Sequence, residues 1–129
     1  MYRAAVEITF HAVHALRIGS ISEEPHEHLW RLHAVVETHQ LDPDGLVIDF
    51  GLLRRRLQQI VKPLSDADSV NSLPALAGGN PSTERFARYI YDQLAKHLPP
   101  RVRLHQITLY ETPDCWACYC PQTDDSRLP

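Results

Sequence analysis

The sequence predicts an α+β domain with the element order ββααββ, in which a four-stranded antiparallel sheet carries two helices on one face. Three observations support this class: two alternating apolar runs near the N-terminus, two stretches with helical spacing, and strand-like composition near the C-terminus. The chain has 129 residues, 43% of them hydrophobic and 22% charged, so it can bury one core. We therefore expect a single domain over residues 1–121 and a C-terminal tail over residues 122–129.

The first two strands are predicted from alternation. Between residues 2 and 10, apolar side chains share one face and polar side chains the other, which is typical of a half-buried strand. Residues 19–25 are loop-like, and a second strand is expected from about residue 28 to residue 38. Residues 42–45, Asp-Pro-Asp-Gly, favour a tight turn. We expect these two strands to pair in an antiparallel sheet.

The two helices are predicted from caps, apolar spacing and prolines. Asp49 can cap the first helix, and Pro63 marks its expected end. Residues 65–80 are expected to form a loop. Asn80 and Pro81 supply a cap and a proline at the first helical position of the second helix, which the prolines at positions 99 and 100 end.

The last two strands are expected at residues 102–111 and 116–120. The apolar parity of the first of them shifts between Leu104 and Ile107. An extra residue in one strand would produce this shift, so we predict a β-bulge near His105 and Gln106.

Helices on one face leave the other face and both edges of such a sheet open. We expect side chains such as Trp30 and Leu32 to need cover, and self-association to supply it. The sequence thus predicts a homo-oligomer in which strands continue across subunits.

Composition excludes several classes of protein. The net charge of −3 argues against a strongly basic nucleic-acid binder, so we expect no nucleic-acid partner. No apolar run approaches the length of a membrane span or a signal-peptide core, so we expect no membrane partner and a cytoplasmic location. The odd number of cysteines argues against a disulfide framework. Cys115, Cys118 and Cys120 are predicted to be buried packing residues rather than a metal or redox site.

A pair of histidines, His26 and His28, is the basis of the site prediction. Residues i and i+2 of a strand project from the same face, so both imidazoles can converge on one point. His14, which ends the preceding alternating run, completes a set of three. Three imidazoles with an open fourth position are typical of a catalytic zinc site. The alternative is chance spacing among the eight histidines of the chain.

Five short motifs occur in order between residues 2 and 120. They are Phe-His-Ala-Val-His-Ala-Leu at 10–16, His-Glu-His at 26–28, Gly-Leu-Val-Ile-Asp-Phe at 45–50, Asn-Pro-Ser-Thr-Glu at 80–84, and Glu111-Thr112 followed by Tyr119. Together they resemble the family of 6-pyruvoyl-tetrahydropterin and 6-carboxy-tetrahydropterin synthases. The resemblance implies a tunnelling fold, in which subunits form trimeric barrels that stack into a homo-hexamer. It also implies Zn²⁺ on His14, His26 and His28, and a small pterin-like substrate at a subunit interface.

The resemblance also assigns substrate-binding residues. Glu111 matches the ring anchor of the family, and a carboxylate can accept two hydrogen bonds from an amino-pyrimidinone edge. Ser82 and Thr83 stand where further ring contacts are expected, although helix capping would explain them equally well. Zinc in such a site acts as a Lewis acid on the hydroxyl groups of the substrate.

The sequence departs from the family at two proton-handling positions. Ser22 stands in place of the catalytic cysteine, and Ala67, next to the matching Asp66, stands in place of a histidine. A subgroup that resembles this family uses a glutamate near the first position and cleaves the side chain to a 6-hydroxymethyl-pterin. We therefore expect Glu23 or Glu24 to be the replacement base, with Asp66 as a further candidate. The alternative is that all three are surface or turn residues.

The leading hypothesis is a zinc-dependent lyase acting on dihydroneopterin triphosphate or a close analogue. A paralogue that binds zinc and a pterin or purine without turnover is the second hypothesis. A purely structural protein without a metal is the third.

Overall fold

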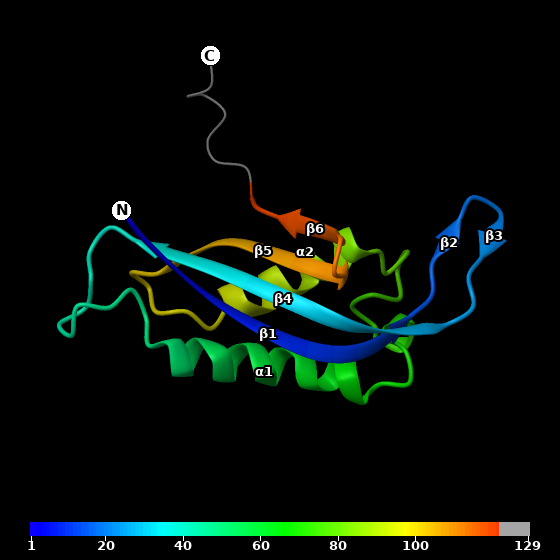
Figure 1. Ribbon diagram of the computed structural model, residues 1–129, viewed down its shortest axis with the longest axis horizontal. Coiled ribbons are helices and arrows are strands. Elements are labelled where there is room, and N and C mark those ends of the chain that lie inside the picture. The colour runs from blue at the N-terminus through cyan, green and yellow to red at the C-terminus, as the bar shows by residue number, and fades with distance from the viewer. Residues whose placement is uncertain (122–129) are drawn as a thin grey trace, which may run out of the picture.

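The computed structural model describes residues 1–121 and has a four-stranded antiparallel sheet at its centre (Figure 1). The strand order is β1–β4–β5–β6, which confirms the predicted sheet. The predicted tail over residues 122–129 lies outside the described residues. The four strands are β1 (Tyr2–His14), β4 (His26–Thr38), β5 (Arg103–Thr112) and β6 (Cys115–Tyr119).

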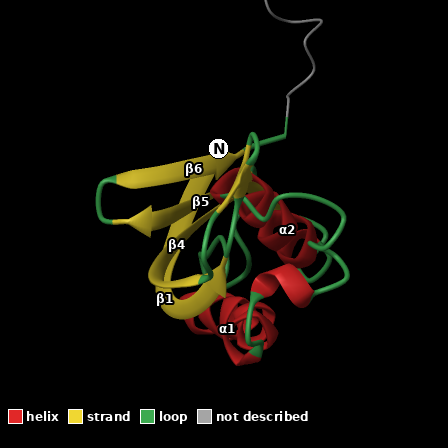
Figure 2. Cartoon of the chain, turned by 90° about the vertical axis from the view of Figure 1, so that its right-hand side faces the viewer, coloured by secondary structure: helices red, strands yellow, loops and turns green. Residues whose placement is uncertain are grey.

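Two helices, α1 (Phe50–Asp66) and α2 (Thr83–Ala95), cover the same face of this sheet (Figure 2). The predicted α+β class and the arrangement of both helices on one face are therefore confirmed. None of the helices within residues 1–121 is both long enough and apolar enough to span a membrane.

The first helix passes through the proline that was expected to end it. The helix α1 continues from Pro63 to Asp66, where the N–H of Ala67 donates to the Pro63 carbonyl at 3.2 Å. Proline lacks one N–H and disfavours the turn before it, but Leu64 is fully buried in the core and holds this last turn against the sheet. The prediction of an end at Pro63 was wrong for this reason.

The second helix begins and ends inside its predicted limits. Its N-cap is Ser82, whose side chain accepts a hydrogen bond from the N–H of Arg85 at 3.2 Å. The expected cap, Asn80, is engaged elsewhere, and the helix ends at Ala95, before the two prolines. The predicted loop between the helices contains a short 3₁₀ helix, η1 (Val70–Ser72).

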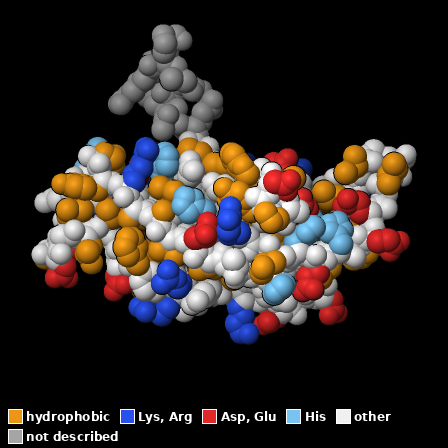
Figure 3. Space-filling view, viewed as in Figure 1, with side chains coloured by type: hydrophobic (Ala, Val, Ile, Leu, Met, Phe, Trp, Pro, Cys, Tyr) orange, Lys and Arg blue, Asp and Glu red, His pale blue; other side chains and the backbone are white. Residues whose placement is uncertain are grey.

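The predicted loop between β1 and β4 contains a small hairpin that projects beyond the sheet (Figure 1). Its strands are β2 (Arg17–Ile18) and β3 (Ile21–Ser22), joined by a turn in which Gly19 has a φ of 63°. Ile18 and Ile21 are 63% and 70% exposed, and they form a hydrophobic tip on this hairpin (Figure 3).

The predicted β-bulge lies where the sequence placed it. Val35 is opposite Gln106 and Val36 is opposite Leu104, so His105 has no partner in the pairing of β4 with β5. Because of this extra residue, the apolar side chains on both sides of the bulge in β5 point to the helix-covered face.

Trp30 and Leu32 need no neighbouring subunit to cover them. Both are fully buried within the single chain, and the Trp30 ring packs edge-on against Phe86 of α2 at 5.0 Å. The Trp30 Nε1 donates to the Ala12 carbonyl at 3.0 Å. The expectation that these side chains require self-association was wrong, because they point to the helix-covered face.

The cysteines are also placed differently from the prediction. Cys115, Cys118 and Cys120 are free and exposed, rather than buried. They lie on or next to the edge strand β6, where Ala117 and Tyr119 take the two half-buried positions.

Truncation of a core leucine should destabilise the chain strongly. Leu57 of α1 is fully buried, and Leu57→Ala is expected to lower the free energy of unfolding by about 2–5 kcal/mol. Its exposed neighbour provides the control, since Gln58→Ala should change stability by about 0.5 kcal/mol or less. Urea unfolding measures both variants. Equal stabilities of the two variants would contradict the assignment of the core.

At the opposite end of β4 from the histidines, the carboxylate of Glu37 is buried among positive groups. Its oxygens lie 2.9 Å from Arg3 Nε, 3.0 Å from Arg103 Nε and 3.5 Å from His105 Nδ1. Burial alone would raise the pKa of this carboxyl. The hydrogen bond from Arg3 and the charges of Arg103 and His105 outweigh burial, and the pKa lies below its usual value of 4.5.

Acid should therefore destabilise the fold partly through Glu37. A carboxyl whose pKa is lowered by folding contributes stability above its unfolded pKa, and loses it as the pH falls through the folded pKa. We expect the free energy of unfolding of Glu37→Gln, measured in urea, to fall less steeply than that of the parent protein as the pH drops below about 5. Glu7→Gln, at an exposed carboxyl, is the control. A fall as steep as that of the parent protein would contradict the role of Glu37.

Candidate metal centre

The pairing of β1 with β4 brings three histidines together. His14 is directly opposite His26, and His28 is opposite Ala12, two residues before His14. All three side chains leave the strands on the helix-covered face, because cross-strand partners share a face and positions two apart do so as well. The antiparallel register is thus the local reason that the three imidazoles meet.

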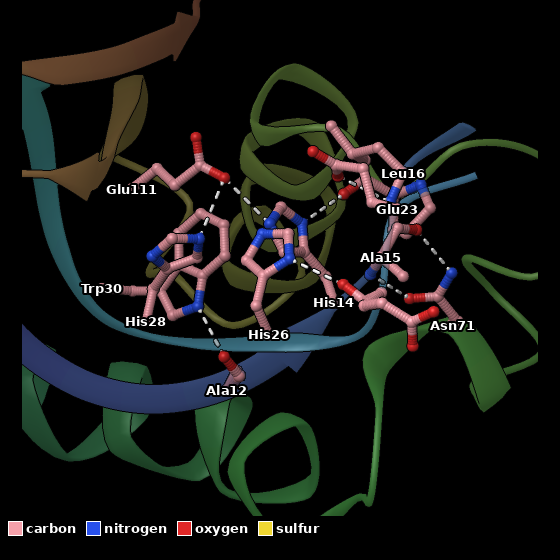
Figure 4. Close-up of polar contacts among 12 residues, drawn as sticks. Ala12, His14, Ala15, Leu16, Glu23, His26, His28, Trp30, Asn71 and Glu111 are labelled. Atoms are coloured by element: carbon pink, nitrogen blue, oxygen red, sulfur yellow. Dashed lines mark hydrogen bonds and ion pairs between the residues drawn. The ribbon is translucent and has the colours of Figure 1, made fainter. Parts of the chain in front are cut away.

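The imidazole rings are in mutual edge-to-face contact (Figure 4). The ring centroids of His14 and His26 are 4.6 Å apart, those of His26 and His28 are 4.6 Å apart, and those of His14 and His28 are 5.4 Å apart. Glu111, near the end of β5, reaches the same point. Its Oε1 lies 2.8 Å from His14 Nε2 and 3.2 Å from His28 Nε2.

Backbone carbonyls orient two of the rings. His14 Nδ1 donates to the Pro81 carbonyl at 3.0 Å, and His26 Nδ1 donates to the Glu24 carbonyl at 3.0 Å. In each ring the Nδ1–H is occupied, so the neutral imidazole presents the lone pair of Nε2 to the cluster. This arrangement, in which Nδ1 bonds the backbone and Nε2 points to the other side chains of the cluster, is typical of metal-binding histidines.

The third imidazole carries an unsatisfied nitrogen. His28 Nε2 is buried and has no well-aligned hydrogen-bond partner among residues 1–121, despite its distance to Glu111. Burial lowers the pKa of His28 below 6.5, Glu111 opposes this shift, and His26 and His14 add to it. The lowered pKa favours a neutral ring with a lone pair.

The donor set fits a zinc ion. One ligand atom from each of His14, His26, His28 and Glu111 lies within 4.8 Å of all the others. Ligand nitrogens about 2.0–2.1 Å from a tetrahedral zinc are about 3.4 Å apart, so side-chain adjustments bring this set to zinc geometry. Lone pairs of His14 and His28 also face a carboxylate oxygen, and such a contact requires a proton or a cation between the groups.

The floor of the cluster is apolar. The Trp30 ring lies edge-to-face with His14 at 4.9 Å and with His28 at 5.4 Å between centroids. His14 itself is completely buried. A charge held here is poorly screened by water, which strengthens its interaction with nearby ligands and reacting groups.

The two glutamates proposed as bases are placed differently. The Glu23 carboxylate is half-buried, and its Oε1 accepts the N–H of Leu16 at 3.0 Å. Its charge acts to raise the pKa of His28, so it lies within electrostatic reach of the cluster. The side chain of Glu24 is exposed, and only its backbone carbonyl contributes to the site. Glu23 is therefore the better-placed carboxylate.

The remaining candidates lie outside the cluster. Asp66 is exposed at the end of α1, where it forms an ion pair with Lys62 at 2.9 Å. Ser82 caps α2, which accounts for its hydroxyl, and Thr83 is buried in the first turn of that helix. Ser22 is exposed on the projecting hairpin.

Two asparagines near the site were not singled out as functional residues from the sequence. Asn71 binds the backbone of Ala15 and Asn80 binds the backbone of Arg17, both in the segment that follows His14. Asn80 was expected to cap the second helix, and Asn71 lies in the loop expected over residues 65–80. Their partners are 56 and 63 residues away, so local sequence could not reveal them.

Comparison with known proteins gives a consistent result. A family model described as 6-pyruvoyl tetrahydropterin synthase matches residues 3–122. A curated dihydroneopterin monophosphate aldolase of Pyrococcus furiosus is 35% identical over 111 residues, which cover 86% of this chain and 87% of that protein. The human 6-pyruvoyl tetrahydrobiopterin synthase is 31% identical over 119 residues, with 81% of each chain covered.

Solved structures show the same fold. A structure of the 6-pyruvoyl tetrahydropterin synthase of Caenorhabditis elegans has a TM-score of 0.77, covering 94% of this chain and 96% of that chain at 17% identity. The similarity confirms the fold of the single tunnelling-fold subunit that the sequence motifs implied.

The electrostatics of the cluster can be tested by NMR titration of the metal-free protein. His28 is expected to titrate below 6.5, because burial and the neighbouring imidazoles oppose its protonation. Glu111→Gln removes a negative charge that favours protonation, so the pKa of His28 should fall further. A His28 pKa above 6.5, or an upward shift in Glu111→Gln, would contradict the geometry.

Proposed function

Because the chain belongs to the 6-pyruvoyl tetrahydropterin synthase family, we propose that it is a zinc-dependent enzyme that cleaves the side chain of a phosphorylated dihydroneopterin. The observation that carries this proposal is the convergence of four ligand atoms within 4.8 Å, with the Glu23 carboxylate close enough for its charge to act on the pKa of His28. The substrate is a dihydroneopterin mono- or triphosphate. The similarity to an aldolase acting on the monophosphate supports cleavage rather than triphosphate elimination.

In this proposal His14, His26 and His28 hold the zinc ion. A bound zinc ion supplies Lewis acidity that makes side-chain hydroxyl groups easier to deprotonate. The carbonyls of Pro81 and Glu24 keep the Nε2 atoms of His14 and His26 available. These residues bind and orient, and they transfer no proton themselves.

Glu23 is proposed as the general base. Its carboxylate takes the proton of the hydroxyl on the second side-chain carbon, and that C–O bond becomes a carbonyl. The bond between the first and second side-chain carbons breaks, and its electron pair enters the C6=N5 imine of the dihydropterin ring. The protonated Glu23 then returns its proton to the first carbon, which restores the C6=N5 imine and gives a 6-hydroxymethyl dihydropterin, while the departing aldehyde keeps the phosphate. A carboxylate can perform this transfer when the hydroxyl is within hydrogen-bonding distance.

The departures from the family favour this chemistry over the synthase reaction. Ser22 and Ala67 cannot act as the usual cysteine and histidine pair. An unassisted serine hydroxyl is a poor base at neutral pH, and alanine carries no proton. Side-chain cleavage needs one base at Glu23, and the structure provides that carboxylate.

Glu111 is proposed to bind the pterin ring through its amino-pyrimidinone edge. A carboxylate can accept two parallel hydrogen bonds from this edge, which fixes the orientation of the ring. Its contacts with His14 and His28 support a ring-binding position next to the proposed metal site.

The second candidate is a paralogue that binds zinc and a pterin without turnover. The observation in its favour is the loss of the family's proton-handling groups at Ser22 and Ala67. Zinc content and pterin binding would be the same in both cases, so only product formation separates them.

A homo-hexamer is the proposed assembly. No helix among residues 1–121 covers the other face of the sheet, which exposes Leu29 and Trp116 at 55% and 58% accessibility. Light scattering of the zinc-loaded protein tests this assembly, and a monodisperse monomer would contradict it.

The test of function compares three variants of the zinc-loaded protein. Dihydroneopterin mono- and triphosphate are each incubated with the parent protein, and 6-hydroxymethyl dihydropterin is measured by chromatography. Glu23→Gln should retain zinc and lose about 10²–10⁴-fold in kcat. Glu24→Gln, the matched control, should stay close to the parent. His28→Ala should lose zinc as measured by elemental analysis.

The outcomes separate the alternatives. Zinc and pterin binding without product from either phosphate would favour the non-catalytic paralogue. An equal loss of kcat in both glutamate variants would contradict the assignment of Glu23.

A further inference from the structure

The backbone segment that leaves β1 is hydrogen-bonded along both of its edges. On one edge, the N–H of Leu16 donates to Glu23 Oε1 at 3.0 Å, and its carbonyl accepts the N–H of Glu23 at 2.8 Å. On the other edge, Ala15 and Arg17 each bind an asparagine side chain. This alternation is that of a strand, in which neighbouring peptide groups point to opposite sides.

Each asparagine replaces a missing strand by making two bonds. The N–H of Ala15 donates to Asn71 Oδ1 at 3.0 Å, and Asn71 Nδ2 donates back to the Ala15 carbonyl at 2.8 Å (Figure 4). The N–H of Arg17 donates to Asn80 Oδ1 at 2.7 Å, and Asn80 Nδ2 donates to the Arg17 carbonyl. A carboxamide offers one donor group and one acceptor side by side, as a peptide does, whereas a carboxylate offers acceptors alone.

Both asparagines are themselves fixed. Asn71 lies in η1, where its N–H donates to Ser69 Oγ at 3.2 Å. Asn80 directly precedes Pro81, whose carbonyl accepts the Nδ1–H of His14. The two side chains therefore tie the exit of β1 to the same loop that orients a metal ligand.

The residue between the two bound positions is Leu16, which holds the Glu23 carboxylate. Its N–H occupies Glu23 Oε1 and leaves Oε2 for proton transfer. Displacement of Ala15 or Arg17 would move the Leu16 peptide group and, with it, the carboxylate. Misplacement of a reacting group by about 1 Å can reduce a rate about 10²-fold.

We propose that Asn71 and Asn80 are positioning residues that aim the Glu23 carboxylate at the substrate. The inference rests on the proposed function, because it assumes that Glu23 is the base. The asparagines act through Leu16 and touch neither the histidine ligands nor the ring-binding Glu111. Their loss therefore lowers kcat and leaves zinc content and KM in place.

The test combines hydrogen exchange with kinetics. Asn71→Asp removes the donor to Ala15 and keeps the acceptor, and Asn71→Ser removes the two-point bond without adding a charge. Asn80→Asp is the equivalent change at Arg17. Gln58→Glu, which adds the same charge on the exposed side of α1, is the control.

The Leu16 amide provides a readout that does not depend on activity. In the zinc-loaded asparagine variants, its protection from exchange, followed by NMR, should fall about tenfold or more as the local structure opens. The kcat for dihydroneopterin monophosphate should fall about tenfold or more, while KM and bound zinc stay within about twofold. Gln58→Glu should match the parent protein in every measurement.

Three results would overturn the inference. An active parent protein whose asparagine variants lose Leu16 protection but keep kcat would overturn this inference alone. A fall in kcat that follows loss of zinc and a lower Tm would show a purely structural role. A parent protein that binds zinc but turns over no dihydroneopterin phosphate would overturn the proposed function, and the catalytic role of the asparagines with it.

Discussion

The pairing of β1 with β4 is the constraint on which the site depends. A slip of one residue would turn His26 and His28 to the other face of the sheet, because the side-chain period of a strand is two. The core prevents this slip. Phe10 is opposite Trp30 in the same pair, and both rings pack against Phe86 of α2. The aromatic contacts that bury the sheet therefore also set the geometry of the histidines.

The cluster combines an apolar floor, the Trp30 ring, with polar groups that a cation can bind together. Trp30 bonds the Ala12 carbonyl, so the indole below the imidazoles has no unmet donor of its own. The histidine nitrogens that do not bond the backbone converge with the Glu111 carboxylate instead. Lone pairs and a negative charge in a poorly hydrated place repel one another, and a divalent ion changes this repulsion into attraction.

Much of this arrangement could be predicted from the sequence. Alternation and helical spacing gave the order of strands and helices. Burial of one face of a strand or helix makes apolar residues recur at a regular interval in the sequence. The spacing of His26 and His28 placed both imidazoles on one face for the same reason. The parity shift in β5 located the bulge at His105. These features are local, so a window of a few residues contains the signal.

The features that could not be predicted depend on contacts between distant segments. The alternation of side chains along a strand puts Trp30 and Leu32 on the same face of the sheet. It does not say whether the helices cover that face. The extension of α1 beyond Pro63 depends on burial of Leu64, which outweighs a local penalty. The contacts of Asn71 with the segment after β1 join separate loops. The sequence around a loop asparagine does not indicate which distant residue it binds.

The metal coordination itself is the most direct test of this account. X-ray absorption at the zinc edge of the loaded protein should show nitrogen and oxygen ligands at about 2.0–2.1 Å, with the scattering pattern of three imidazoles. Sulfur ligands at about 2.3 Å would place the metal on the exposed cysteines instead and would contradict the histidine site.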